Sequence, residues 1–220
     1  MTRKALVAAL AVTATMLLAP AAQAKHRSAS CYPHGSRTVT ANNFVRVYGV
    51  PPTDPDAQGS RRLVACSLTS GRRKALGGYE ACQFAGQYLF NIRLTGRMVG
   101  YVSAECLGFS SSVYVRDMTT GRVLWIAETA PGRGHTVTDL EVARNGSAAW
   151  IAAWKNAEYE RDYEGRVLRT VEVSGDRQPV TRDDSLDIKP GSLALGRTDG
   201  SGATPFYWSK GGQVFSATLR

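Results

Sequence analysis

Four polar residues stand at equivalent places along the chain, each between two apolar neighbours. They are Thr40, Asn91, Glu141 and Asp187. Carboxylate and amide oxygens are ligands that calcium accepts, so Asn91, Glu141 and Asp187 would be metal ligands if they gathered around one axis. The preferred interpretation is a water-filled channel, whose polar lining satisfies the hydrogen bonding of groups that would otherwise be buried. Calcium is the one cofactor that the pattern suggests.

Residues suited to catalysis are scarce. The chain has three histidines, of which His26 and His34 lie in the N-terminal lead and His135 follows a stretch rich in Gly and Pro. A nucleophile–histidine relay needs a histidine held by packed surroundings, and a loop histidine does not meet that need. Glu141 and Asp187 could act as the acid and base of a glycosidase, although the sequence does not fix their separation. We therefore assign no catalytic and no cofactor-binding residue, and we do not expect an enzyme.

The first 24 residues have the pattern of a cleavable secretory signal. Arg3 and Lys4 give a positive start, residues 5–18 are uncharged and apolar, and Ala22-Gln23-Ala24 resembles a cleavage site. The apolar run is shorter than the roughly 20 residues that a membrane span needs, although an uncleaved anchor is the alternative. We expect a mature chain that begins at Lys25, works in an extracellular or periplasmic location, and has no later membrane span.

The charge balance of the chain is basic. Twenty-seven Lys and Arg residues oppose 18 Asp and Glu residues, and loss of the signal lowers the formal net charge from +9 to +7. This excess favours contact with anionic surfaces or polymers. Arg61-Arg62 and Arg72-Arg73-Lys74 could form an anion-binding patch, because both runs flank one predicted strand. Aromatic residues do not alternate with these runs, so nucleic acid is not an expected partner.

Beyond the signal the chain is built from short β-branched and aromatic runs separated by Gly or Asn turns, which predicts hairpins and no long helix. The clearest unit covers residues 88–128 and contains tight turns at Thr95-Gly96 and Thr120-Gly121. After an N-terminal lead at 25–37, a domain at 38–220 holds four such units, at about 38–78, 88–128, 136–173 and 185–220. The glycines assigned to the last hairpin of each unit are Gly71, Gly121, Gly165 and Gly212.

Units of four strands at this period are typical of propeller blades. Inner strands that are apolar on both faces, such as residues 148–154, fit blades that pack face to face. We therefore predict an all-β fold of four four-stranded antiparallel units, propeller-like, with a two-sheet sandwich as the alternative. The hairpin of residues 113–122 resembles the outer hairpin of a TolB-like or quinoprotein-like propeller blade. The resemblance implies a fold and no activity, and those families usually have six to eight blades.

An even number of cysteines in an exported chain predicts disulfides. In alternating up-and-down strands, the links between units and the loops after the second strands emerge on one common face. Folding the hairpin about Thr95-Gly96 brings Cys106 close to Cys82, within reach of a disulfide. The predicted pairs are therefore Cys82–Cys106 and, by elimination, Cys31–Cys66.

These features predict a secreted, non-catalytic binding or scaffold module that uses its loop face. The partner would be an anionic envelope polymer or another secreted protein. Two alternatives stay open: a small extracellular hydrolase or lyase with its site at the channel mouth, and a structural envelope protein without a discrete site.

Overall fold

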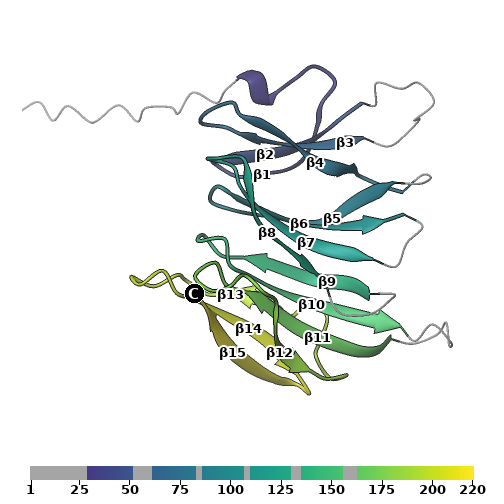
Figure 1. The fold of residues 1–220 in the computed structure, drawn as a ribbon, viewed down its shortest axis with the longest axis vertical. Helices are drawn as coiled ribbons and strands as arrows, with labels where there is room; N and C mark the ends of the chain where they lie inside the picture. The colour runs from purple at the N-terminus through teal and green to yellow at the C-terminus, as the bar shows by residue number, and fades with distance from the viewer. Residues whose placement is uncertain (1–28, 52–60, 83–85, 107–109, 130–134, 156–162) are drawn as a thin grey trace, which may run out of the picture.

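The computed structural model describes residues 29–51, 61–82, 86–106, 110–129, 135–155 and 163–220. Nearly all regular structure in these ranges is β-strand, apart from a 3-10 turn at Ala29–Cys31. No helix in the described ranges has the length and apolar character needed to cross a membrane. The strands form consecutive antiparallel meanders stacked on one another (Figure 1). The prediction of an all-β array of repeated units is confirmed.

The first two units are complete four-stranded meanders. Their strands are β1 (Arg37–Ala41), β2 (Val45–Val50), β3 (Arg62–Ser67) and β4 (Arg73–Tyr79), then β5 (Gln87–Thr95), β6 (Met98–Glu105), β7 (Ser111–Asp117) and β8 (Arg122–Glu128). A single parallel pair between Tyr79 and Tyr88 joins them into one eight-stranded sheet. Gly96 and Gly121 lie in turns with positive φ, which confirms both predicted hairpins.

The third unit extends further than the sequence indicated. It consists of β9 (His135–Val142), β10 (Ala148–Lys155), β11 (Tyr163–Val171) and β12 (Val180–Asp184), so it ends at Asp184 rather than at 173. Gly165 is not in a turn: it lies inside β11 opposite Trp154. The strand continues because Val167 and Val171 pack into the core beside β10. The run Tyr159-Glu160-Arg161-Asp162 of this unit lies outside the described residues.

The fourth unit has three strands within the described part of the chain, not four. They are β13 (Ala194–Leu195), β14 (Thr204–Lys210) and β15 (Gln213–Leu219). A four-stranded unit would need an inner strand around Asp187, and no separate strand forms there. Ile188 instead bridges Lys210, so this segment and β13 follow one another along the same edge of β14. The buried side chain of Ile188 joins the core beneath β14, which accounts for this position.

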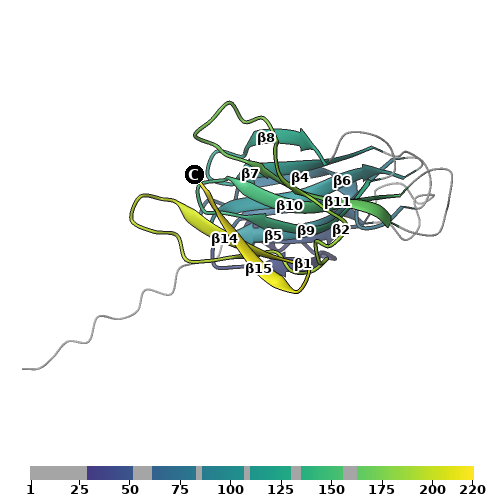
Figure 2. The ribbon, with the colours of Figure 1, turned by 90° about the horizontal axis from the view of Figure 1, so that it is seen from below.

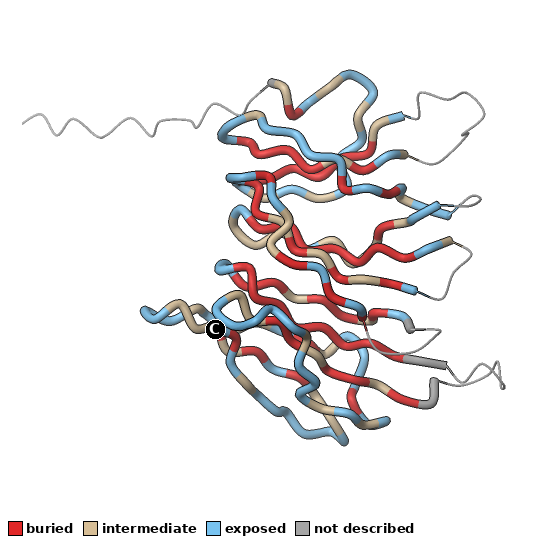
Figure 3. The backbone as a smooth tube through the Cα atoms, in the orientation of Figure 1, coloured by how far each residue is buried: buried red, intermediate tan, exposed pale blue. Residues whose placement is uncertain are grey.

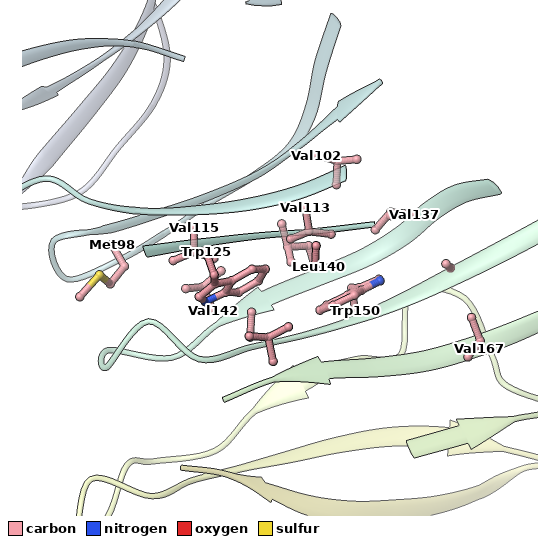
Figure 4. Close-up of a cluster of buried hydrophobic side chains, with 14 residues drawn as sticks. Met98, Val102, Val113, Val115, Trp125, Val137, Leu140, Val142, Trp150 and Val167 are labelled. Atoms are coloured by element: carbon pink, nitrogen blue, oxygen red, sulfur yellow. The ribbon is translucent and has the colours of Figure 1, made fainter. Parts of the chain in front are cut away.

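Apolar layers between successive units hold the array together. The layer between the second and third units contains Trp125 and Trp150, whose rings stack 6.2 Å apart (Figure 4). Both indoles donate to backbone carbonyls, of Gly146 and Thr129 respectively, so their polar atoms are satisfied. The backbone of β6 also lies close to β9 in this layer, since a Cβ at Gly100 would lie 2.3 Å from a side-chain methyl of Val142. Glycine is therefore required at that position of β6.

The array is open. The first and fourth units lie at opposite ends of the stack, so the units do not close into a ring (Figures 1 and 2). The N-terminal lead covers the outer face of the first unit, where Cys31 packs with Tyr48 and Leu68. The buried Arg46 donates to the carbonyl of Cys31 and lies over the rings of Tyr32 and Tyr48. Figure 3 shows the contrasting exposure of β15 at the other end.

The strand register sorts the connections onto two sides. Tight turns such as Gly96 and Gly121 lie on one side of the array, at the left in Figure 1. The ends of β2, β4, β6 and β8 lie on the other side, where the chain passes within or between units. We call this second side the connection face.

Candidate functional site

The structure does not bring the three predicted metal ligands together as a set. The amide nitrogen of Asn91 donates to the carbonyl of Val137 at 2.7 Å, and Asn91 has a φ of 48° where a bulge interrupts the β5–β6 register. Asn91 therefore links β5 to β9 by a hydrogen bond. Asp187 is exposed, and its backbone carbonyl accepts from Gly211. The described residues contain no group of three or more His, Cys, Asp and Glu that could hold a metal ion.

Glu141 is engaged by a cation of the neighbouring unit. Its carboxylate lies 3.5 Å from Nε of Arg93 on β5. Burial raises the pKa of Glu141 above its ordinary value, the Arg93 guanidinium opposes that rise, and the nearby Asp139 adds to it. Asp139, not Glu141, reaches the fourth unit, because its carboxylate accepts from the backbone N–H of Gly191 at 2.7 Å. These contacts assign both carboxylates to the joining of units.

A cleft lies between the first and second units. Its volume is about 280 Å³. Residues from β1, from the ends of β3 and β4 and from β5 line it: Arg37, Thr38, Val39, Leu63, Glu80, Leu89 and Ile92. Leu63 and Leu89 are buried and form an apolar base, whereas Arg37 and Thr38 are exposed. The cleft therefore combines an apolar floor with a charged mouth, which suits a ligand with both kinds of surface.

The register places this cleft at the connection face. Arg37 pairs with Gly49 at the end of β2, and Gly49 pairs with Leu63 at the start of β3. A Cβ at Gly49 would lie 2.7 Å from the Glu80 carboxylate and 2.8 Å from Cβ of Arg61. Gly49 thus allows an acidic and a basic side chain to lie against the sheet at one point.

Arginines gather around the mouth of the cleft. The Arg61 guanidinium donates to the carbonyl of Gly35 at 2.9 Å, which ties the lead to this side of the unit. Arg37 is exposed on β1 and lines the cleft, whereas Arg62 alternates with Leu63 and lies on the opposite face of β3, the face of Val64. We call Arg37 and Arg61 the cleft arginines. Glu80 is the acidic residue of the cleft lining, so the mouth has an excess of positive charge.

The second basic run does not belong to this site. Arg72 donates to the carbonyl of Thr119 at 2.6 Å, and Lys74 lies against Gly121 in the same turn of the second unit. Arg73 pairs with Cys66, whereas Arg62 pairs with Tyr79 at the opposite end of the β3–β4 hairpin. The two runs therefore lie at opposite ends of the hairpin and do not form one patch.

Both predicted cysteine pairs lie at disulfide distance. The sulfurs of Cys31 and Cys66 are 2.05 Å apart, and those of Cys82 and Cys106 are 2.26 Å apart. Cys82 follows the cleft residue Glu80 closely, and its partner lies at the end of β6. This second bond therefore ties the connection between the first two units to the second unit, beside the cleft.

The sequence indicated only part of this site. Arg61-Arg62 was a recognisable basic run, but Arg37, Glu80 and Ile92 carried no motif that related them. They meet because β1 and β5 are neighbouring strands of different units, which the local pattern does not reveal. Among the histidines, His34 is exposed in a turn of the lead, His26 lies outside the described residues, and nothing is described of the His135 side chain.

Comparisons with known proteins do not indicate a ligand or an activity for this site. The sequence matches no protein family and no curated protein. Among solved structures, similarity extends to a prolyl endopeptidase, with 12% identity and a TM-score of 0.46 over 88% of this chain and 30% of that one. A second is the β-propeller domain of the trilobed protease from Pyrococcus furiosus, with 9% identity and a TM-score of 0.26 over 86% and 82%. The chain spans less than a third of the endopeptidase, and neither likeness supports an inference about activity.

Proposed function

We propose that the protein is a secreted, non-catalytic binding module that holds an anionic envelope polymer at the cleft between its first two units. The observation that carries this proposal is the combination of an apolar floor with the cleft arginines at its mouth. We also propose that the fold is related to TolB-like or quinoprotein-like propellers, and this relation concerns the fold alone. It supplies no ligand.

The charge and position of the cleft support a polymer ligand. Arginine pairs with carboxylate and phosphate in a planar, two-pronged geometry, so a repeated anionic group suits Arg37 and Arg61. The cleft lies between two units and is open at its mouth, which allows a chain to pass across it instead of ending inside it. Apolar Leu63 and Leu89 would contact the non-ionic face of each repeating unit.

The stiffness of the site supports binding as its role. The cleft walls are β-strands, and the Cys82–Cys106 bond fixes the connection beside them. A site whose walls are already ordered loses little conformational freedom when a ligand binds, so more of the contact energy appears as affinity.

The test is a titration of the purified protein with polygalacturonate, with uncharged dextran as the comparison polymer. We expect Arg37→Gln and Arg61→Gln each to weaken binding by about tenfold, the loss typical of one hydrogen bond to a charged group. Arg144→Gln is the matched control, because Arg144 is exposed in the β9–β10 turn on the opposite side of the array. It removes the same charge without touching the cleft.

Three results would contradict the proposal. An equal loss in Arg144→Gln would mean that only net charge matters, and equal binding of dextran would remove the anionic ligand. Shortening of the polymer during the titration would favour the extracellular hydrolase or lyase, and absence of any binding would favour the structural envelope protein.

A further inference from the structure

The outer strands of the units are protected from pairing with other strands, with one exception. A free strand edge attracts further strands, and natural sheets block it with charges and bulges. The β3–β4, β7–β8 and β11–β12 pairings each contain a register shift, and β4, β8 and β12 all carry charged residues. Arg169 and Arg177 also donate to the β8 carbonyls of Glu128 and Leu124.

The last strand has none of these features. β15 reads Gln-Val-Phe-Ser-Ala-Thr-Leu from Gln213 to Leu219, with no charge and no proline. Its pairing with β14 is unbroken from Thr204–Leu219 to Lys210–Gln213. It is the terminal strand of its sheet in the described part of the chain, and Val214 is 72% exposed. Its free edge is therefore regular, uncharged and unprotected.

The hairpin geometry shows which residues face that edge. Gly211 and Gly212 both have positive φ and form a two-residue turn, so the flanking pair Lys210–Gln213 exchanges backbone hydrogen bonds. Backbone groups alternate along an antiparallel strand. Those of Val214, Ser216 and Thr218 therefore point away from β14, toward the free edge.

We propose that this edge pairs with the β15 strand of a second copy of the chain, antiparallel, about a two-fold axis through Ser216. This register uses the whole strand. It places Ser216 opposite Ser216, Val214 opposite Thr218, and Phe215 opposite Ala217. Large side chains thus meet small ones, and inward-facing residues meet inward-facing residues of the partner copy. The six strands form one continuous sheet.

Charge favours a second copy at this strand and nowhere else along the outer edges. Both copies carry the same positive net charge, so their association needs an uncharged contact. On β15 no charged residue meets its own counterpart. The nearest cation on the hairpin, Lys210, lies on β14 and is paired with Asp183 at 2.8 Å. The terminal strand of the eight-stranded sheet, β1, offers no comparable edge, because it carries Arg37 and its pairing with β2 contains a register shift.

Sedimentation equilibrium of the mature protein tests this pairing over about 5 to 500 µM, a range that covers dissociation constants in the micromolar region. We expect the weight-average mass to rise twofold. Ser216→Lys places two cations at the axis and should keep the protein monomeric. Ser209→Lys is the control, because Ser209 lies on the same outer face but on β14, away from the edge. It should still dimerise, and thermal melting of both variants checks that they are folded.

A cross-linking experiment fixes the register. Ser216→Cys alone should form a disulfide-linked dimer on mild oxidation, because the two Cα atoms at the axis are expected about 5.5 Å apart. Thr218→Cys alone should not, but it should cross-link when mixed with Val214→Cys. A monomer at all concentrations would overturn the proposal and point to a different protein as the strand donor. A dimer that persists in Ser216→Lys would also overturn it.

Discussion

Charged side chains in this array serve mainly to join units. Arg93 on β5 pairs with Glu141 on β9, and the amide of Asn91 reaches the backbone of the same strand. Arg166 donates to the carbonyls of Leu186 and Ile188, which holds the fourth unit against the third. Arg166 finds these acceptors because a meander leaves backbone carbonyls without a strand partner at its margins.

The Arg93–Glu141 pair predicts a pH dependence of stability. Because burial raises the folded pKa of Glu141 above its unfolded value, the folded state binds more protons between the two values. This contribution to stability is fully present below the unfolded pKa of about 4.3 and is lost as pH rises through the folded pKa. Glu141→Gln should remove that loss, so its melting temperature relative to wild type should rise with pH across this window.

Calorimetry at a series of pH values checks this expectation. Arg93→Gln removes the cation that opposes the shift, so it should raise the pKa of Glu141 further and move the loss of stability to higher pH. A melting-temperature difference between Glu141→Gln and wild type that does not change with pH would show that the carboxylate is not desolvated.

At the scale of elements, short cross-links fix how each strand pair meets its neighbour. Arg72 and Arg177 each donate from a turn to a carbonyl of the second unit, from opposite neighbours. The two disulfides act at the first and second units only. Apolar layers and arginines therefore join units throughout the stack, and the disulfides add covalent bonds in its first half only.

Removing one disulfide should measure its contribution to the free energy of unfolding. Cys82→Ser with Cys106→Ser should lower the free energy of unfolding by about 3 kcal/mol, because the bond closes a loop between residues 24 positions apart. Chemical denaturation gives this value. Peptide mapping without reductant should show the Cys82–Cys106 and Cys31–Cys66 pairs in wild type, and a Cys66–Cys82 peptide would contradict both the pairing and the strand order.

At the scale of the molecule, an open stack has two ends, and this chain treats them differently. The lead and the Cys31–Cys66 bond cover the first unit, with Arg46 held between two tyrosines. The fourth unit ends in the exposed β14–β15 hairpin. One end of the array is thus covered, and the other end exposes a strand that is available for association. The cleft opens on a third side.

Export makes a prediction for the whole chain. The secreted protein should have the intact mass of a chain that starts at Lys25, with both disulfides formed. Mass spectrometry with and without reductant measures both properties, because each reduced bond adds two hydrogen atoms. A mature N-terminus at Met1 would contradict the secretory interpretation, and free thiols in the secreted protein would contradict an oxidising location.

The sequence by itself determined the hairpins, most strands and the cysteine pairs. These depend on local information: glycine at Gly96 and Gly121 permits tight turns, and alternating strands place Cys82 and Cys106 on one side. Gly165 suggested a wrong boundary for the third unit, because a glycine, although it is favoured in turns, also occurs inside strands. The run Gly165-Arg166-Val167-Leu168 closely resembles Gly121-Arg122-Val123-Leu124, in which Gly121 does lie in a turn.

Only the tertiary structure decided how the units meet. The open stack, the three-stranded last unit and the cleft all depend on contacts between residues far apart in sequence. Asn91, Glu141 and Asp187 occupy similar places in the repeat, yet an open and twisted stack gives each a different neighbour. A periodic pattern specifies what each unit can bury, but the angle and distance between units arise from packing, such as that of Gly100 against Val142.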